Sequence, residues 1–319
     1  MAKRRYMGIG EETTYGTTAN LSKFLDIVSE DLNPAQNIIY AELVDSRDLR
    51  KYAPGGYGIS GGVEMFGEPE NISNILKWTL GEVTTTTVAT GVYEHTFKGA
   101  DSISSFTAEI GLDDIAARRV VGCAIDSLSL ESVKNELLSA SLDIVGQKDS
   151  LVTATTPTFS ALNPFVFHQG TVKIAGTTAT GRVEALRLDI GNNVFDDIFT
   201  LGSRFLPRLE IGRREMTGSM DLSFIDTEHI KRFFGSAAAT EPLDSLNTLA
   251  LNALFKSSII TGTYSYELEL DIPKVLFDTS KVNIDRRERI VQAIEYTVLY
   301  DSVSAYALKA RLRNAESSI

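Results

Sequence analysis

Apolar and polar residues alternate along most of this chain. Clean two-residue periods run over 105–112, 137–145, 183–190, 220–224, 264–272 and 290–299. Such alternation is typical of β-strands that place one face on a core and the other toward solvent or a partner. Clusters of Gly, Thr, Asn and Asp separate the runs, as turns require. The pattern therefore predicts a mainly β protein.

Two short segments have a helical period instead. Residues 69–80 and 227–234 each place apolar side chains on one stripe, and a glycine follows each segment, at Gly81 and Gly235. Glycine at this position ends helices because it adopts a left-handed conformation without strain. We also expect a short helix within 243–258. The predicted stripes consist of Ile72, Ile75, Leu76 and Leu80 in the first helix and of Ile230, Phe233 and Phe234 in the second.

The two helical segments belong to a longer internal echo. GISGGVEMFGEPENISNILKWTLG at 58–81 is followed later by EMTGSMDLSFIDTEHIKRFFG at 215–235, and SRDL at 46–49 is followed by SRFL at 203–206. The element order is the same in both halves, which favours a duplicated unit over chance similarity among β-rich segments. Further matches pair Gly62 with Gly218, residues 105–112 with 265–272, and residues 137–145 with 290–298.

The length of the chain and the echo together predict two domains. A chain of 319 residues corresponds to about two domains at roughly 150 residues each. We expect a first domain with an N-terminal arm over 1–146 and a second domain with a C-terminal arm over 171–319. Residues 147–170 are rich in Thr, Ser and Pro, and are expected to connect the domains over the surface.

The chain is acidic, with a formal net charge of −11. Residues 1–150 carry 22 acidic and 13 basic side chains, and residues 151–319 carry 20 and 18. This balance does not favour tight binding of nucleic acid, which needs clustered Lys and Arg, although acidity for solubility alone is an alternative reading. Small basic clusters at 3–5, 118–119, 213–214, 286–289 and 309–313 are interpreted as contacts with the acidic surface of a neighbouring copy.

No motif in the sequence indicates catalysis. Nucleophile, phosphate-binding and kinase signatures are absent from the sequence, and His95, His168 and His229 lack metal-ligand spacing. We expect His95 on an exposed strand face and His229 on the surface of the second helix. Adjacent acidic pairs at 11–12, 113–114 and 196–197 point apart in a strand or turn, which argues against a glycosidase. We therefore expect no enzymatic activity, no cofactor and no metal.

The single cysteine, Cys123, lies in an apolar run and is expected to be a buried hydrophobe. It cannot form a disulfide within the chain, so folding in a reducing compartment is the default. No apolar stretch approaches 18 residues and no apolar segment follows the basic start, so we expect neither membrane insertion nor a signal peptide.

The ETTYGT sequence at 12–17, the GGVEM strand at 61–65 and the short apolar helix ending at Gly81 resemble the tail tube proteins, or major tail proteins, of long-tailed bacterial and archaeal viruses. The resemblance implies a β-barrel or β-sandwich with a flanking short α-helix, here in two tandem tail-tube-like copies. It also implies stacked rings that form a hollow tube for viral DNA. Most members carry one such domain and form six-membered rings, so two copies predict a pseudo-hexameric ring of three chains.

The same resemblance implies the partners and location of the chain. The partners would be further copies of itself, the tape measure, tail terminator and baseplate or distal tail proteins, and double-stranded DNA in transient, non-specific passage. The location would be the virion tail, after assembly in the host cytoplasm. A β-sandwich adhesin or carbohydrate-binding module is the alternative, but it would need an exposed aromatic platform, and we expect the only tryptophan, Trp78, on the core side of its helix.

Candidate interface residues follow from these patterns. Residues 15–17 are expected to anchor the N-terminal arm, either on a neighbour or on its own domain. The Gly- and Tyr-rich loop 48–60 suits contact with the next subunit or ring, and the matched arginines of the two SRxL loops are expected at domain or subunit boundaries. The candidates are Tyr15, Gly16, Thr17, Arg47, Tyr52, Tyr57 and Arg204.

Overall fold

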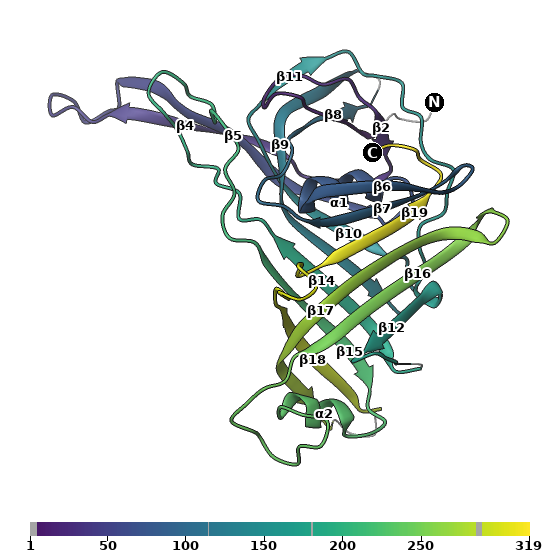
Figure 1. Cartoon of the computed structure of the whole chain (residues 1–319). Helices are drawn as coiled ribbons and strands as arrows, with labels where there is room; N and C mark the ends of the chain where they lie inside the picture. The colour runs from purple at the N-terminus through teal and green to yellow at the C-terminus, as the bar shows by residue number, and fades with distance from the viewer. Residues whose placement is uncertain (1–4, 114, 180, 285–288) are drawn as a thin grey trace.

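The computed structural model describes residues 5–113, 115–179, 181–284 and 289–319. The chain is mainly β, as the alternation predicts, with two short α-helices, α1 (Ile72–Leu80) and α2 (Glu228–Phe233), and a 3-10 turn, η1 (Phe167–Gln169) (Figure 1). The first strands are β1 (Met7–Glu11), β2 (Lys23–Leu25), β3 (Ile27–Glu30), β4 (Asn33–Ala41), β5 (Lys51–Phe66), β6 (Gly81–Ala89), β7 (Val92–Gly99), β8 (Phe106–Leu112), β9 (Ala116–Val133), β10 (Ser139–Gly146) and β11 (Lys148–Val152). The later strands are β12 (Gly170–Ile174), β13 (Thr177–Thr178), β14 (Val183–Gly191), β15 (Glu215–Ser223), β16 (Leu249–Thr261), β17 (Tyr264–Val282), β18 (Val291–Val298) and β19 (Lys309–Asn314).

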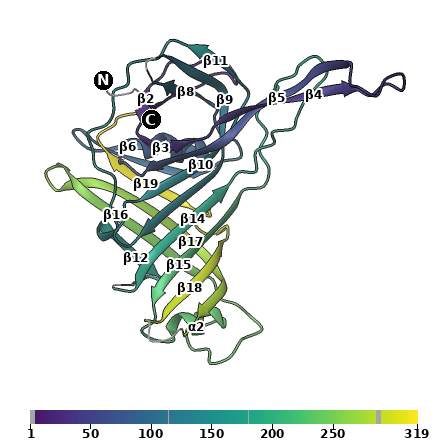
Figure 2. The ribbon, with the colours of Figure 1, turned by 180° about the vertical axis from the view of Figure 1, so that it is seen from behind.

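One curved antiparallel sheet contains strands from both halves of the chain. Strands β3 and β4 pair with one edge of β5, and β10, β9, β14, β15, β18 and β17 follow in that order. Figure 2 shows this sheet from β5 near the top to β18 near the bottom. The pairing of β9 with β14 joins the two halves within one sheet.

The long strands β9 and β17 continue into a second layer. The N-terminal part of β9 pairs with β8 and β11, and β8 pairs with β1. The N-terminal part of β17 pairs with β16 on one side and β19 on the other, and β19 pairs with β7 of the first half. A single buried apolar cluster fills the space between the layers, and α1 packs against it with Trp78 fully buried.

The two halves of the chain share one pairing scheme. The order β5, β10, β9, β8, β1 in the first half corresponds to β15, β18, β17, β16, β12 in the second. The register of β9 on β10 shifts at Asp126, and that of β17 on β18 shifts at Asp278. Helix α1 contacts β9 and α2 contacts β17.

This scheme corrects two of the sequence matches. Gly218 lies on the core face, where a Cβ atom would be 2.4 Å from the Tyr296 hydroxyl, whereas Gly62 lies on the opposite face of β5. Gly61, opposite Ile144, is therefore the counterpart of Gly218. Residues 105–112 correspond to β16 and not to 265–272. A one-residue slip is invisible in an alternating sequence but moves every side chain to the other face.

The helices largely follow their predicted bounds. The four predicted residues of α1 are all buried, and Gly81 and Gly235 have positive φ values of 97° and 125°. The helix expected within 243–258 is wrong, because β16 begins at Leu249 and its Leu, Ala and Phe side chains alternate into the core. Tertiary pairing with β12 and β17 outweighs the helix propensity of Leu and Ala there. The expected connection, 147–170, contains β11 and η1.

Candidate functional surfaces

One face of the curved sheet that runs from β3 and β5 to β17 is polar. Along each strand, buried aliphatic residues alternate with residues that point away from the core, as Leu142 and Ile144 alternate with Ser141 and Asp143 in β10. We call this outward surface the polar face. It comprises Gly62, Glu64, Ser127, Ser129, Glu131, Ser141, Asp143, Arg187, Asp189, Glu215, Thr217, Ser219, Asp221, Thr279, Lys281, Ala293, Glu295 and Thr297.

Acidic side chains outnumber basic ones on the polar face. Its two basic side chains are paired on the face itself: Arg187 Nε lies 2.9 Å from Asp189 Oδ1, and Lys281 Nζ lies 3.0 Å from Glu295 Oε1. The other carboxylates of the polar face have no basic partner among the described residues of that face. The Gly, Ser, Thr and Ala residues that lie among the charged residues have short side chains, so few side chains protrude from this face. A phosphate backbone would be repelled by such a surface rather than bound.

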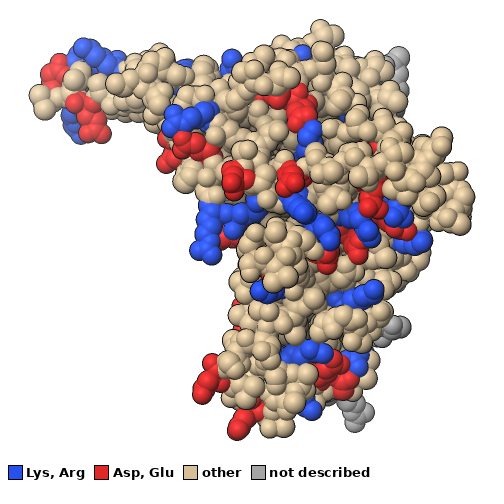
Figure 3. Space-filling view, viewed as in Figure 1, with Lys and Arg blue, Asp and Glu red and all other residues tan. Residues whose placement is uncertain are grey.

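The opposite, outer layer has balanced charge. Across β7, β19 and β17, acidic and basic side chains form a cross-strand ladder, visible as a mixed band in Figure 3. Arg313 bonds Glu94 and Glu267 at 2.8 Å each, and Lys309 lies 2.8 Å from Asp271. The basic side chains of cluster 309–313 thus pair with carboxylates of their own chain, and their contact with a neighbour stays a prediction. Arg119 likewise pairs with Glu109, whose buried carboxylate has a lowered pKa; burial opposes this, and the hydrogen bonds of Tyr6, Thr155 and Arg119 outweigh it.

The remaining basic clusters have different surroundings. Arg214 donates to the carbonyl of Ala100 at 2.8 Å and to Asn192 Oδ1 at 3.1 Å, so it also bonds within the chain. Residues 1–4 and 285–288 lie outside the described residues, so most of the clusters at 3–5 and 286–289 cannot be placed. Arg289 itself pairs with Glu184.

A hairpin arm, residues 33–60 of β4 and β5 with their connecting loop, projects from the body (Figures 1 and 2). Its distal strands carry large apolar side chains on the surface: Ile39 is 56% exposed and Tyr52 is 76% exposed, and Tyr40 lies opposite Tyr52. The tip has both charge signs (Figure 3). An exposed apolar surface of this kind marks a site of contact with another molecule.

The two SRxL loops adopt the same turn in different surroundings. The hydroxyls of Ser46 and Ser203 each accept a hydrogen bond, at 3.1 Å, from the amide two residues later. Arg47 is exposed near the arm tip, whereas Arg204 donates to Gln36 Oε1 at 2.9 Å and lies 5.6 Å from the ring centre of Tyr57. Arg204 therefore connects the second half of the chain to the root of the first-half arm.

Tyr57 is fixed at that root by further bonds. Its amide donates to the carbonyl of Arg204 at 2.8 Å, and its hydroxyl donates to Asp149 Oδ1 at 2.5 Å. Burial and the Asp149 carboxylate raise the pKa of Tyr57 to about 12. A cleft of about 420 Å³ lies beside it, lined by Gln36, Phe199 and Leu206 among others.

The ETTYGT sequence folds around a buried carboxylate. Glu12 accepts hydrogen bonds from Gly16 N at 2.9 Å, Ser105 Oγ at 2.8 Å, Thr107 Oγ1 at 2.9 Å and Gly122 N at 2.8 Å. Gly16 has φ +72°, and a Cβ there would lie 2.3 Å from an oxygen of the Gln147 side chain, so this turn requires glycine.

Tyr15 and Thr17 also bond or pack within the chain. Thr17 N donates to Thr14 O at 3.0 Å, and burial raises the pKa of Tyr15 to about 12. In this chain the segment packs on its own body, which matches one of the two alternatives for residues 15–17. Contact of these residues with a neighbour stays a prediction.

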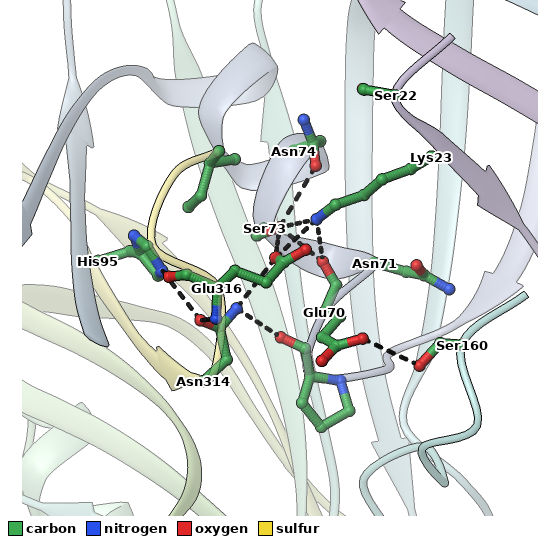
Figure 4. Close-up of polar contacts among 12 residues, drawn as sticks. Ser22, Lys23, Glu70, Asn71, Ser73, Asn74, His95, Ser160, Asn314 and Glu316 are labelled. Atoms are coloured by element: carbon green, nitrogen blue, oxygen red, sulfur yellow. Dashed lines mark hydrogen bonds and ion pairs between the residues drawn. The ribbon is translucent and has the colours of Figure 1, made fainter. Parts of the chain in front are cut away.

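A polar cluster binds the C-terminal segment to α1 (Figure 4). Lys23 Nζ bonds Glu70 O at 2.8 Å, Ser73 Oγ at 2.9 Å and Glu316 Oε2 at 2.7 Å. His95 belongs to this cluster through Asn314 Oδ1, 3.0 Å from its Nε2. No sequence motif indicates this cluster, because its members are single polar residues from distant segments.

The predicted locations of His95 and His229 were both wrong. His95 is fully buried because β7 is covered by β6, β19 and the C-terminal segment, and not exposed on a strand face. His229 is 6% exposed on the inner side of α2, and neither ring nitrogen has a hydrogen-bond partner there. His168 is exposed, and Cys123 is buried as predicted. Among the described residues, no group of His, Cys, Asp and Glu has the arrangement of a metal site.

Comparison with known proteins identifies the family. The family model for phage tail tube proteins matches residues 2–298, nearly the whole chain. The chain belongs to the phage tail tube protein family. This confirms the resemblance seen in the ETTYGT and GGVEM sequences and supports a structural role in the virion tail. None of the curated proteins matches the chain. In the described part of this tail tube protein, neither helix has the length and apolar character that a membrane span needs.

Proposed function

We propose that three copies of this chain close into a pseudo-hexameric ring, and that the rings stack into the hollow tube through which viral DNA is delivered. The observation that carries the proposal is the shared pairing scheme of the two halves, down to the register shifts at Asp126 and Asp278. Two units of one fold per chain give six similar positions from three chains. A closed ring also covers sheet edges, which otherwise pair with other chains.

The polar face suits the lumen of such a tube. Duplex DNA carries one negative charge per roughly 1.7 Å of axis, so an acidic and low-relief wall neither binds nor retains it. Glu64, Asp143, Glu295 and their neighbours would then repel the DNA during transient, non-specific passage. The ionic ladder of β7, β19 and β17 lies on the other layer, where balanced charge suits the outside of the tube.

The hairpin arm suits stacking between rings. It extends away from the body, and its apolar side chains, such as Ile39 and Tyr52, remain exposed in the single chain. Burial of apolar surface contributes about 25 cal/mol per Å². Arg47 at the arm tip and the Tyr57–Arg204 contact at the arm root would both lie at such a boundary. Tape measure, terminator and distal tail or baseplate proteins would contact the ends or bore of the tube after assembly in the host cytoplasm.

The adhesin or carbohydrate-binding alternative lacks support from the aromatic residues. Trp78 is fully buried and stacks on Phe106 with 4.3 Å between ring centres. Two exposed tyrosines, Tyr40 and Tyr52, lie on the projecting arm, whereas the exposed Tyr300 follows β18 on the body, so these tyrosines do not form one platform. The absence of catalytic activity stays a prediction.

Negative-stain electron microscopy of the purified protein at increasing concentration tests the proposal. Rings with three chains and six lobes, and tubes built from them, are expected, with the trimer mass confirmed by light scattering. A monomer that persists at high concentration, or rings of six chains, would contradict the proposed stoichiometry.

A further inference from the structure

The chain contains one complete junction between its two repeated units. There, the C-terminal half of β9 pairs with β14, with Leu188 opposite Leu130, Asp189 opposite Ser129, and Arg187 opposite Glu131. Asn192 N donates to Asp126 O at 2.7 Å and continues the ladder. This internal junction shows how one unit of this fold is joined to the next by backbone hydrogen bonds.

The edges that would form the same junction again are both present at the ends of the sheet. On β17, residues 276–282 pair with β18 on one side. On the other side, no strand in the described part of the chain pairs with them, because β16 begins at Leu249, opposite Val275 of β17. These residues take the place of the β9 residues that pair with β14: Val282 follows Asp278 by four positions, as Leu130 follows Asp126.

The other edge belongs to β3 and the residues after it. Leu32 lies next to Gly61 as Leu188 lies opposite Gly218, and both leucines are buried. The side of β3 that faces away from β5 has no strand partner in the described residues. Residues 30–33 therefore take the place of residues 186–189 of β14.

We propose that β17 of one chain pairs with β3 of the next, in the register of the internal junction. Leu32 of one chain lies opposite Val282 of its neighbour, and Asn33 lies opposite Lys281. The inference rests on the proposed ring and adds the surface and register by which a second copy of this chain binds. Pro34 stands where Ile190 stands in β14, and because it lacks an N–H, the new ladder is one hydrogen bond shorter there.

Charge on the polar face favours this pairing over the wrong one. At the internal junction, basic Arg187 on β14 faces acidic Glu131 on β9. At the new junction, Asp31 takes the place of Arg187 and lies diagonally from Lys281 on β17. Opposite charges on facing strands stabilise a pair and like charges destabilise it. Pairing β17 with a β14 strand from another chain would bring Arg187 near Lys281, and this contact is unfavourable.

In the single chain, the β3 edge is capped by side chains. The Leu32 amide donates to Glu30 Oε2 at 3.2 Å, and Arg118 donates to the Leu32 carbonyl. Glu30 and Arg118 are themselves 3.7 Å apart. Caps of this kind keep an edge from pairing at random. A β17 strand in the proposed register replaces both bonds with backbone hydrogen bonds. The amide and carbonyl of Leu32 therefore have partners before and after assembly.

Disulfide trapping tests the register in assembled, full-length protein. In an antiparallel pair, hydrogen-bonded and non-hydrogen-bonded residue pairs alternate. The backbone bonds of Asn192 with Asp126 and of Lys134 with Glu184 mark two hydrogen-bonded pairs, so Asp189 and Ser129 form a non-hydrogen-bonded pair. Cα atoms of such pairs are roughly 4.5 Å apart, within the range of a disulfide. Asn33→Cys with Lys281→Cys reproduces this geometry between chains. Oxidised tubes of this double variant are expected to give disulfide-linked dimers and trimers on a non-reducing gel, with the 33–281 bond found by mass spectrometry.

Matched variants give the controls. Asp189→Cys with Ser129→Cys is expected to form its disulfide inside one chain and keep the mass of a monomer. Asn33→Cys with Ser280→Cys is expected to give no bond, because neighbouring residues of a strand point to opposite faces. Tubes in which 129–189 forms but 33–281 does not would overturn the inference and leave the proposed function intact. Failure of the unmodified chain to form rings would overturn the proposed function and, with it, the inference.

Discussion

At the scale of single residues, Glu12 explains why the ETTYGT sequence has its form. The glutamate satisfies four donors from three segments, and Gly16 provides the turn that brings its own amide back to the carboxylate. The tyrosine then packs beside Gly122, where a Cβ atom would be 3.1 Å from its ring. The ETTYGT sequence, which resembles the family, thus holds the end of the N-terminal strand β1 against the body of the same chain.

Glu12→Gln is expected to lower the free energy of unfolding by about 3 kcal/mol. The amide group would turn a donor toward buried donors, and each buried donor left without a partner costs roughly 1–3 kcal/mol. Urea unfolding of the unassembled protein measures the loss. Glu11→Gln is the control: Glu11 makes a partly exposed ion pair with Lys77, so a change of no more than about 1 kcal/mol is expected. Equal losses in the two variants would contradict this account.

Glu68 is expected to make stability fall as pH rises. Burial, with Asp26 and Glu70 nearby, raises the pKa of Glu68 to about 7. Between the pKa of an unfolded glutamate and pH 7, the folded state keeps a proton that the unfolded state has released, so this contribution is full in acid and is lost toward pH 7. Glu68→Gln keeps an acceptor for Asn71 but removes the titration.

The measurement is urea unfolding of wild type and Glu68→Gln at pH 5 and pH 8. Relative to wild type, the variant should gain about 2 kcal/mol of stability between the two pH values, since one pKa unit corresponds to about 1.4 kcal/mol. Glu64→Gln, at an exposed position of the preceding strand β5, serves as the control. A difference between wild type and Glu68→Gln that does not change with pH would show that Glu68 titrates normally.

At the scale of elements, the arm is the part of the fold that the body does not need. Its distal residues pair only with each other, as Tyr40 does with Tyr52, and lie outside the buried cluster. The folded body therefore gains little from them. Their exposed apolar side chains gain a role only when a second molecule covers them.

Removal of the distal arm is expected to leave rings but stop stacking. The variant replaces residues 38–54 by Asn-Gly, a two-residue turn that closes a hairpin between Asn37 and Gly55. Its urea midpoint should stay close to that of the full chain, and electron microscopy should show separate rings without tubes. The full-length chain prepared in parallel is the control. Tubes of normal length from the shortened chain would assign stacking to another surface.

At the scale of the whole molecule, the proposed duplication within one chain has a physical consequence. A ring of identical single units has identical junctions, whereas this chain offers an internal junction with Arg187 facing Glu131 and an outer one with Asp31 near Lys281. The reversed charges distinguish the two junctions, so neighbouring chains are selected to join end to end in the proposed ring. The acidic polar face continues across the internal junction within the chain and, by the same register, across the outer one.

The sequence by itself determined most of the strands, the positions of α1 and α2, and the family. Two-residue alternation predicts strands because a pleated strand has that period, and the stripes ending at Gly81 and Gly235 predict helices because glycine tolerates the left-handed end. The burial of Trp78 and Cys123 followed from their apolar neighbours. The similar order of elements in the two halves was visible in the sequence, although the exact register of the match was not, since Gly61 and Gly62 are indistinguishable in an alternating pattern.

Only the tertiary structure decided which face of each strand is buried and which side chains meet. Arg313 and Glu94 are 219 positions apart, and their contact exists only because β19 pairs with β7. The same pairing buries His95, and pairing with β12 on one side and β17 on the other holds 249–261 as a strand. Local sequence fixes what a segment can become. Partners brought from far along the chain fix its register, and register alone assigns the acidic side chains to one continuous face.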